Sequence, residues 1–144
     1  MKDNILKELF ELTDKAYKND EFPVAAIIYD DNYNIVSKGY NKRNKSNITT
    51  DHAEIIAINK ANKKTKSWRL NELSMIVSLE PCDMCKTVIK EARLKRVYYV
   101  IPRLEYKKQY KNASIKLYKN DNKKIDKYIE KYNDKISSFF SEKR

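Results

Sequence analysis

Apolar residues recur at three- and four-residue steps through the first part of the chain, which predicts an amphipathic helix ending near Asn19. The apolar run from Pro23 to Tyr29 is nearly continuous and predicts a strand covered on both faces. Turn-forming residues at 30–32 and a second strand over residues 34–40 complete a predicted β-hairpin. The stripe that this pattern predicts to be buried is made of Ile5, Leu6, Leu9, Phe10, Thr13, Ala16 and Tyr17.

Beyond the hairpin, the pattern alternates helices and strands. A polar loop is expected over residues 41–50, and Thr49, Thr50 and Asp51 are N-cap candidates for the helix that follows it. Two successive strand–helix–strand steps predict an α/β layered domain with helices on both faces of the sheet. The later elements are a buried strand over residues 73–79, a helix over 83–93, a strand over 97–101 and a terminal helix with an apolar stripe from Ile125 to Phe140.

The length of the chain, 144 residues, fits one domain with a single core. No change of composition marks a boundary, so we expect one domain over residues 1–144. Its C-terminal part, about 103–144, is expected to be basic and helical, although residues 103–121 are polar and carry no clear period.

Basic residues outnumber acidic ones, 31 to 20, which gives a net charge of +11. From Arg103 to Arg144 there are 13 basic and 6 acidic residues, so this part holds most of the excess. Such a charge suits a polyanionic partner such as nucleic acid. An AT-rich coding sequence would also account for abundant Lys, Asn, Ile and Tyr beside a single Gly, so composition alone leaves both possibilities open.

No apolar segment approaches the roughly 20 residues of a membrane-spanning helix. The first residues alternate charged and apolar side chains and lack the apolar core of a signal peptide. We therefore expect a soluble, cytoplasmic protein without a membrane partner. Its two cysteines lie three positions apart and make a poor disulfide framework, so metal or redox chemistry explains them better.

The only histidine and the only two cysteines lie in two short motifs, "DHAE" and "EPCDMC". A catalytic zinc site takes three protein ligands of these types and keeps one position open for water. Both motifs lie where predicted helices begin, and the positive end of a helix dipole lowers the pKa of a thiol. Cys82 and Cys85 would also face the same side of one turn. Glu54, two residues after His52, would be close enough to move a proton of that water without binding the metal.

Each motif, taken alone, also fits a simpler role. A single histidine at a helix start is usually a cap or a surface group, and a C-x-x-C pair is often redox-active or structural. A thioredoxin-like site would leave His52 and Glu54 unused. A structural zinc site is closed by four protein ligands, and only three are available here. The combination therefore favours an open, catalytic metal site.

Together the two motifs resemble the H-x-E…P-C-x-x-C signature of the zinc-dependent cytidine and deoxycytidylate deaminase superfamily. Within it the chain looks most like the bacterial tRNA adenosine deaminases, which convert the wobble adenosine of an anticodon to inosine. The similarity extends from the first predicted helix to the fourth strand, and the terminal "SSFFSEKR" is similar as well. The matching segments are "EFPVAAIIYD", "GYNKR", "DHAEIIAINKA", "VSLEPCDMC" and "RVYY".

The resemblance implies a three-layer α/β/α fold with a mixed sheet of about five strands, a homodimer, and the anticodon stem-loop of tRNA as partner. It implies that His52, Cys82 and Cys85 hold one Zn²⁺ per subunit. Glu54 would be catalytic, taking a proton from water, delivering it to N1 of adenine as C6 is attacked, and helping ammonia leave. The substrate-binding residues that the resemblance implies are Asn41, Val24, Ala53, Leu79, Glu80 and Pro81.

The chain also departs from the family pattern. Ala25 stands where the family has glycine, which adds a methyl group beside the pocket. After the fourth strand, residues 100–105 replace a stretch that usually contains glycine and an acidic residue. These differences concern how RNA is held and, to a lesser degree, which substrate is used.

Two alternative functions remain. A deaminase of a free base, nucleoside or nucleotide, of the guanine or cytosine type, would carry the same zinc motif. A catalytically silent RNA-binding subunit would keep the fold, although it would not require Glu54. The "LEPC" segment and the tyrosines of the basic tail favour RNA, because aromatic rings stack on unpaired bases. About half of those tyrosines should instead serve packing. The tyrosines are Tyr106, Tyr110, Tyr118 and Tyr128.

Overall fold

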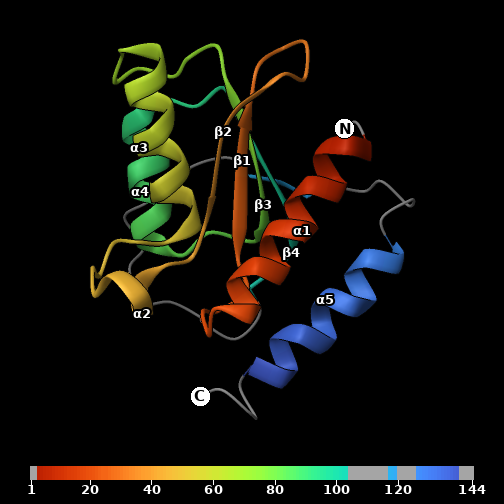
Figure 1. The fold of residues 1–144 in the computed structure, drawn as a ribbon. Coiled ribbons are helices and arrows are strands. Elements are labelled where there is room, and N and C mark those ends of the chain that lie inside the picture. The colour runs from red at the N-terminus through yellow and green to blue at the C-terminus, as the bar shows by residue number, and fades with distance from the viewer. Residues whose placement is uncertain (1–2, 104–116, 120–125, 140–144) are drawn as a thin grey trace.

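The computed structural model describes residues 3–103, 117–119 and 126–139 (Figure 1). Their order along the chain follows the predicted alternation of helices and strands, with one additional short helix and one additional short strand. The elements are α1 (Asp3–Lys18), β1 (Ala25–Tyr29), β2 (Ile35–Tyr40), α2 (Arg43–Ser46), α3 (Ala53–Thr65), β3 (Ser74–Leu79), α4 (Asp83–Ala92), β4 (Arg96–Ile101), β5 (Tyr118–Lys119) and α5 (Asp126–Ser138).

The sheet is mixed, with strand order β2-β1-β3-β4-β5. The hairpin strand β1 is antiparallel to both β2 and β3, whereas β3, β4 and β5 are parallel to one another. A tight turn suffices for the antiparallel pair, and α4 provides the crossover that the parallel pair β3 and β4 requires. Four strands have five or six residues, and the two-residue β5 brings the sheet to the expected count of about five.

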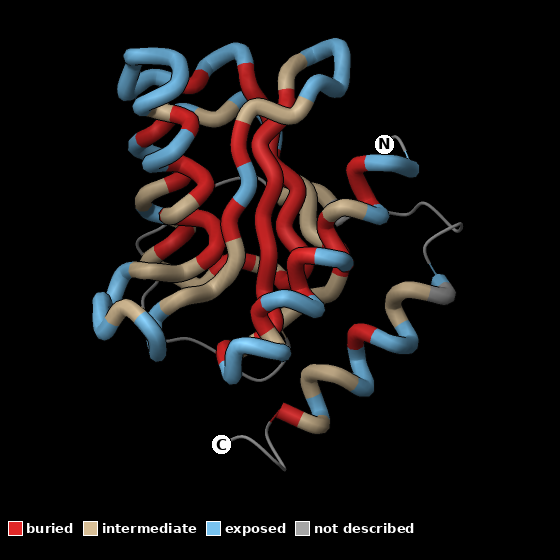
Figure 2. The backbone as a smooth tube through the Cα atoms, in the orientation of Figure 1, coloured by how far each residue is buried: buried red, intermediate tan, exposed pale blue. Residues whose placement is uncertain are grey.

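Helices cover both faces of this sheet, α3 and α4 on one side and α1 and α5 on the other (Figure 1). A hydrophobic core lies on each face of the sheet, and alternate residues of β1 contribute to one or the other. Ala26 and Ile28 pack with α3 and α4, while Ala25 and Ile27 pack with α1. Every residue of β1 and β3 is buried, as Figure 2 shows for the centre of the sheet. The predicted three-layer α/β/α fold is confirmed.

Helix α5 is fixed to the sheet by a buried polar contact. The hydroxyl of Tyr132, 1% exposed, lies 2.8 Å from Ser78 Oγ on β3. Ser78 Oγ also accepts a hydrogen bond from the Ala25 N–H at 3.1 Å. Tyr128 stacks on Phe10 of α1 at 5.2 Å between ring centroids, so this tail tyrosine serves packing.

Three local expectations need correction or lie outside the described residues. The segment over residues 41–50, predicted to be a loop, contains α2. The sequence pattern does not predict this helix because four residues are too few to show a helical period. The N-cap of α3 is His52, so the proposed caps Thr49, Thr50 and Asp51 are wrong. Residues 104–116, 120–125 and 140–144 are not described, and they include Tyr106, Tyr110, Ile125 and Phe140. None of the described helices is both long and apolar enough to span a membrane.

Candidate metal centre

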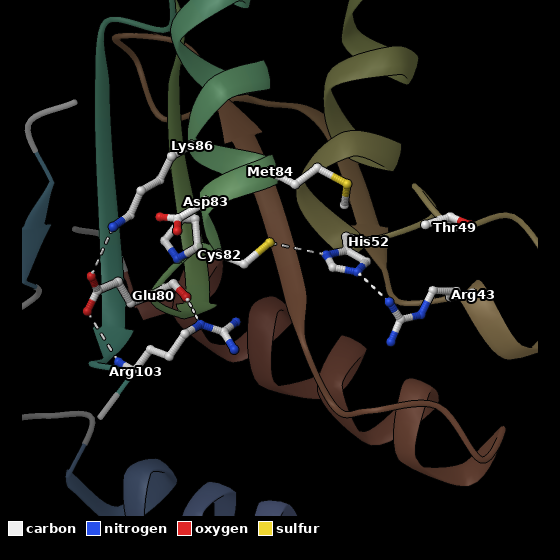
Figure 3. A pocket seen from close by; sticks show the side chains of 10 residues that line it. Arg43, Thr49, His52, Glu80, Cys82, Asp83, Met84, Lys86 and Arg103 are labelled. Atoms are coloured by element: carbon white, nitrogen blue, oxygen red, sulfur yellow. Dashed lines mark hydrogen bonds and ion pairs between the residues drawn. The ribbon is translucent and has the colours of Figure 1, made fainter. Parts of the chain in front are cut away.

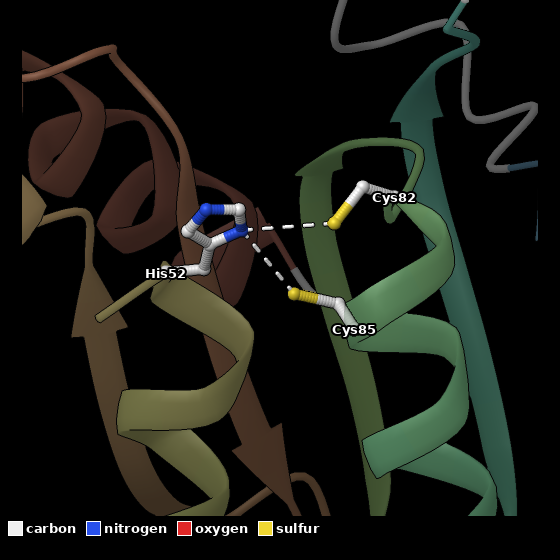
Figure 4. A group of neighbouring side chains, drawn as sticks. All are labelled: His52, Cys82 and Cys85. Carbon is white, nitrogen blue, oxygen red and sulfur yellow. Dashed lines mark hydrogen bonds between the residues drawn. The ribbon is translucent and has the colours of Figure 1, made fainter. Parts of the chain in front are cut away.

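Helices α3 and α4 begin at the same end of the sheet, and their first residues carry the two sequence motifs. His52 is the N-cap of α3 and Cys82 is the N-cap of α4, both with extended backbone. Their carbonyl groups accept the first helical hydrogen bonds, from Ile56 N–H and Lys86 N–H at 3.0 and 2.9 Å. Because both helices pack on one face of the sheet and run the same way, the two N-caps lie side by side (Figure 4).

The imidazole of His52 faces both cysteines across this gap (Figure 4). His52 Nδ1 lies 3.5 Å from Cys85 Sγ and 3.7 Å from Cys82 Sγ, and all three ligand atoms lie within 4.8 Å of one another. The other ring nitrogen, Nε2, lies 3.3 Å from Arg43 Nη1. One imidazole nitrogen and two sulfurs are the ligand types that Zn²⁺ prefers, so the cluster is a possible zinc site.

The two thiols share a proton and already favour one negative charge. A hydrogen bond from the Cys85 thiol lowers the pKa of Cys82 to about 3, with His52 contributing in the same direction. The same hydrogen bond, together with burial, raises the pKa of Cys85. Metal ligands must lose their protons to bind, so a pair that holds one thiolate is prepared for a divalent cation.

Glu54 lies in the first turn of α3 and is only 2% exposed. Burial raises the pKa of its carboxyl group, and the negative charge of Cys82 raises it further, while His52 and Arg103 oppose the shift. A hydrogen bond links this carboxyl group to the Cys85 thiol. A carboxyl group with a raised pKa, in contact with the candidate metal ligands, is suited to take and return a proton near neutral pH.

A cavity of about 300 Å³ opens beside His52 and Cys82 (Figure 3). Glu80 organises one wall: its carboxylate accepts a hydrogen bond from the Arg103 N–H at 3.2 Å and pairs with Lys86 at 3.6 Å. Arg103 Nε donates to the Glu80 carbonyl oxygen at 3.1 Å, so the guanidinium is fixed near the cavity. The lining residues are Arg43, Thr49, His52, Glu80, Pro81, Cys82, Asp83, Met84, Lys86 and Arg103.

The loop that carries Arg43 is held by a buried carboxylate far away in the sequence. Glu21, 2% exposed, accepts hydrogen bonds from the N–H groups of Asn44 and Lys45 at 3.0 and 2.8 Å. These are N–H groups of the first turn of α2, which have no partner within a helix. Asn41 Oδ1 accepts the Ala53 N–H at 2.8 Å and joins the same loop to the start of α3.

The residues predicted to contact substrate fall into two groups. Glu80 and Pro81 line the cavity, whereas Asn41 is bonded to the start of α3, and Val24, Ala53 and Leu79 are buried outside the lining. Their roles toward a substrate stay predictions. The structure adds lining residues that the sequence analysis did not select: Arg43, Thr49, Asp83, Met84, Lys86 and Arg103. Asp83, Met84 and Lys86 belong to or adjoin the C-x-x-C turn and could have been chosen from it.

Comparison with known proteins gives matches over most of the chain. Residues 1–101 match the family model described as the cytidine and deoxycytidylate deaminase zinc-binding region. A curated relative, the tRNA-specific adenosine deaminase of Rickettsia bellii, is 41% identical over 95 residues, which is 65% of this chain and 66% of that relative. The match to the corresponding Haemophilus influenzae protein spans 56% of its length. The aligned region is thus less than two thirds of these relatives.

Two solved structures share the fold with moderate identity. One comes from a study of A-to-I editing by tRNA:A34 deaminases; it is 26% identical, with a TM-score of 0.70, and the match covers 80% of this chain and 95% of that one. The other is a guanine deaminase from Bacillus subtilis, also 26% identical, with a TM-score of 0.67 and coverage of 93% and 95%.

Proposed function

The chain belongs to the cytidine and deoxycytidylate deaminase zinc-binding family, and we propose that it is a zinc-dependent hydrolase converting adenosine to inosine at the wobble position of a tRNA anticodon, with release of ammonia. The observation that carries this proposal is the convergence of His52, Cys82 and Cys85 beside the buried carboxyl group of Glu54. A structural site would need a fourth protein ligand, and the chain has no further His or Cys.

The metal would be held by His52 Nδ1 and by the sulfurs of Cys82 and Cys85, one ion per subunit. Zinc in such a site supplies Lewis acidity that brings the pKa of water close to neutral. Arg43 lies at Nε2 of the same imidazole, on the side away from the sulfurs. With the metal on Nδ1, the neutral ring would carry its proton on Nε2, and a guanidinium has only donors, so Arg43 would have to turn away from Nε2 when the metal is bound.

Glu54 is the proton carrier in this proposal. Its carboxylate would take a proton from the attacking water and deliver it to N1 of adenine as C6 is attacked. It would then move the proton of the new C6 hydroxyl group to the amino group, which leaves as ammonia while the C6 carbonyl forms. A carboxyl group with an ordinary pKa would be a weak acid catalyst at neutral pH. Burial raises the pKa of Glu54, which favours the return of the proton.

Around the base, the predicted contacts are Asn41, Val24, Ala53, Leu79, Glu80 and Pro81. Glu80 and Pro81 lie in the cavity wall, and Asn41 is one hydrogen bond away from Ala53 at the start of α3. Three lining cations, Arg43, Lys86 and Arg103, would meet the phosphates that flank the base. Two carboxylates, those of Glu80 and Asp83, also line the cavity, so three cations against two anions leave a net charge of +1, which suits a phosphate-bearing substrate better than a neutral free base.

A specific observation supports one alternative. The Bacillus subtilis guanine deaminase matches more of this chain, 93%, than the tRNA deaminase structure does, so deamination of a free base or nucleoside, including the cytosine type, is the second candidate. A silent RNA-binding subunit is a weaker alternative, because binding RNA would not require a buried carboxyl group against the metal ligands. The homodimer, the single domain over residues 1–144 and the cytoplasmic location are also kept as proposals.

Incubation of the purified, zinc-loaded protein with bulk tRNA, and separately with adenosine, guanine and cytidine, distinguishes these functions. We expect ammonia and inosine from tRNA and neither product from the small molecules. Sequencing of the reacted tRNA would show the change at the first anticodon position. Ammonia from guanine or cytidine alone would overturn the proposal in favour of the small-molecule deaminase. RNA binding without any ammonia would identify the silent subunit.

A further inference from the structure

Helices α3 and α4 both end at the side of the molecule away from α2, and the turns there are exposed (Figures 1 and 2). Helix α3 spans thirteen residues, so this end lies about 20 Å from the candidate zinc site. Trp68, in the turn after α3, is 54% exposed, the largest exposed fraction among the large apolar side chains described. A single exposed apolar side chain is common on a protein surface, so a separate role for Trp68 rests on the groups that lie against its ring.

Two arginines hold their side chains against this ring. The guanidinium of Arg69 lies 4.5 Å from the centroid of the Trp68 ring, and that of Arg93 lies 5.1 Å from it. The two cations are therefore within about 10 Å of each other, a distance at which salt screens their repulsion only partly. Stacking on a ring fixes a guanidinium while its N–H donors stay available, which reduces the entropy lost when a phosphate binds.

A second cavity adjoins the stack and adds further positive charge. It measures about 260 Å³ and is lined by Lys90, Arg93, Lys95 and Arg96 together with apolar residues and Tyr118. Lys95 is neutralised by Asp31 at 3.1 Å. Within the described ranges, no carboxylate lies at ion-pair distance from the two stacked arginines, Lys90 or Arg96. Three of the four cations that line the cavity, Lys90, Arg93 and Arg96, thus have no carboxylate partner among the described residues.

We propose that Trp68, Arg69, Lys90, Arg93 and Arg96 form a distal basic surface that binds the phosphate backbone of RNA, outside the deaminase pocket. The inference rests on the proposed function for the identity of the polyanion. An RNA whose reacting base occupies the pocket would have to extend about 20 Å along the protein to reach this surface. The surface would add affinity and fix the orientation of the stem without reading its sequence.

Helix electrostatics alone would also favour cations here, since Lys90 lies in the last turn of α4 and Arg93 is its C-cap. That effect would change the stability of the protein and leave RNA binding unaffected. Arg69 separates the two effects, because it lies in a turn outside both helices and still stacks on the same ring.

The test compares the double variant Arg69→Gln/Arg93→Gln with Lys7→Gln/Lys18→Gln on α1, which removes the same charge from exposed positions elsewhere. Binding of tRNA is measured by fluorescence anisotropy between about 50 and 300 mM salt, where counterion release dominates the salt dependence of the affinity. Loss of two phosphate contacts should weaken binding on the order of tenfold and reduce the slope of log K against log salt by about 1.5. The single variant Arg69→Gln should reduce the slope by about half of that amount. The α1 control should leave the slope unchanged.

Turnover adds a second readout. The double variant should raise the KM for full-length tRNA and leave kcat/KM unchanged for a stem-loop with a stem of only two base pairs. An equal loss of kcat/KM on both substrates would contradict the proposal that the distal basic surface binds RNA. An equal effect of the α1 control on tRNA binding would contradict it as well. If the wild-type protein deaminates no RNA, the proposed function fails, and the anisotropy comparison still decides whether the surface binds RNA.

Discussion

Gly39 of β2 lies so close to Ala53 of α3 that a Cβ atom at Gly39 would be 2.5 Å from the Ala53 carbonyl oxygen and 2.9 Å from the Ala57 nitrogen. Both neighbours are backbone atoms of α3, the helix whose N-cap is His52. The only glycine of the chain therefore determines how closely α3 approaches the sheet.

Gly39→Ala should push the start of α3 away from the sheet and destabilise the protein by about 1–3 kcal/mol, the usual range for overpacking. Because His52 and Glu54 lie on that turn, zinc content and activity should fall together. Urea unfolding and metal analysis measure the two effects. Lys38→Ala at the neighbouring exposed position is the control, and an equal loss in that variant would show that the close approach of α3 is not the cause.

Cys85→Ser should abolish stoichiometric zinc binding, because it removes the buried sulfur that faces His52 Nδ1 at 3.5 Å. In the wild-type protein, zinc affinity should decrease as the pH falls, since protons compete for the two sulfurs and the imidazole. Competition with a chromophoric chelator at several pH values measures this dependence. Retention of one zinc per chain in the serine variant would contradict the assigned ligand set.

Glu54→Gln should keep the zinc and the fold while lowering kcat by about 10²–10⁴-fold, the range for loss of a general acid–base group. The amide occupies the same buried volume and cannot transfer the proton. Zinc analysis, circular dichroism and ammonia release are measured on the same preparation. A variant that retains turnover would show that another group carries the proton.

Glu21→Gln should loosen the loop that bears Arg43, because an amide offers one acceptor oxygen to two N–H groups that a carboxylate now satisfies. We expect a loss of about 1–3 kcal/mol in stability and a higher KM with a smaller change in kcat. Steady-state kinetics and unfolding separate these effects. Glu11→Gln, on the exposed side of α1, should change neither quantity.

Tyr132→Phe should cost about 1 kcal/mol through the lost hydrogen bond with Ser78. Burial raises the pKa of Tyr132 above its usual value near 10, so the folded protein retains this proton more strongly than the unfolded chain does. The associated stability is present below pH 10 and is lost as the pH rises toward the folded pKa. Unfolding between pH 8 and 11, about the range around the ordinary tyrosine pKa of the unfolded chain, should show a smaller alkaline decline in the phenylalanine variant. An identical decline would contradict the shift.

The sequence predicts the elements that have a clear period, such as α1 and the buried strands β1 and β3, because burial on one or two faces leaves a direct trace in the spacing of apolar residues. It also predicts the three soft ligands, since the chain contains no others. It does not predict α2, whose first turn is capped by Glu21 from more than twenty positions away. The N-cap positions of α3 and α4 hold His52 and Cys82 rather than ordinary caps, so local capping preferences mislead at the site itself.

Arg103 illustrates the same limit in the pocket. No local pattern marks it, because its place depends on the backbone of Glu80, which reaches it only when β4 pairs with β3. The distal basic surface is equally non-local, since Trp68 and Arg93 come from different helix ends. Short-range patterns reveal which residues are buried, whereas cation clusters arise from the topology.

The buried contact between Tyr132 and Ser78 has a consequence for how such a chain can diverge. The contact joins α5 to β3 directly, so the position of α5 on the sheet does not depend only on the sequence that precedes it. Substitutions between Arg103 and Asp126, outside β5, could therefore accumulate while the metal ligands and the scaffold stay constant.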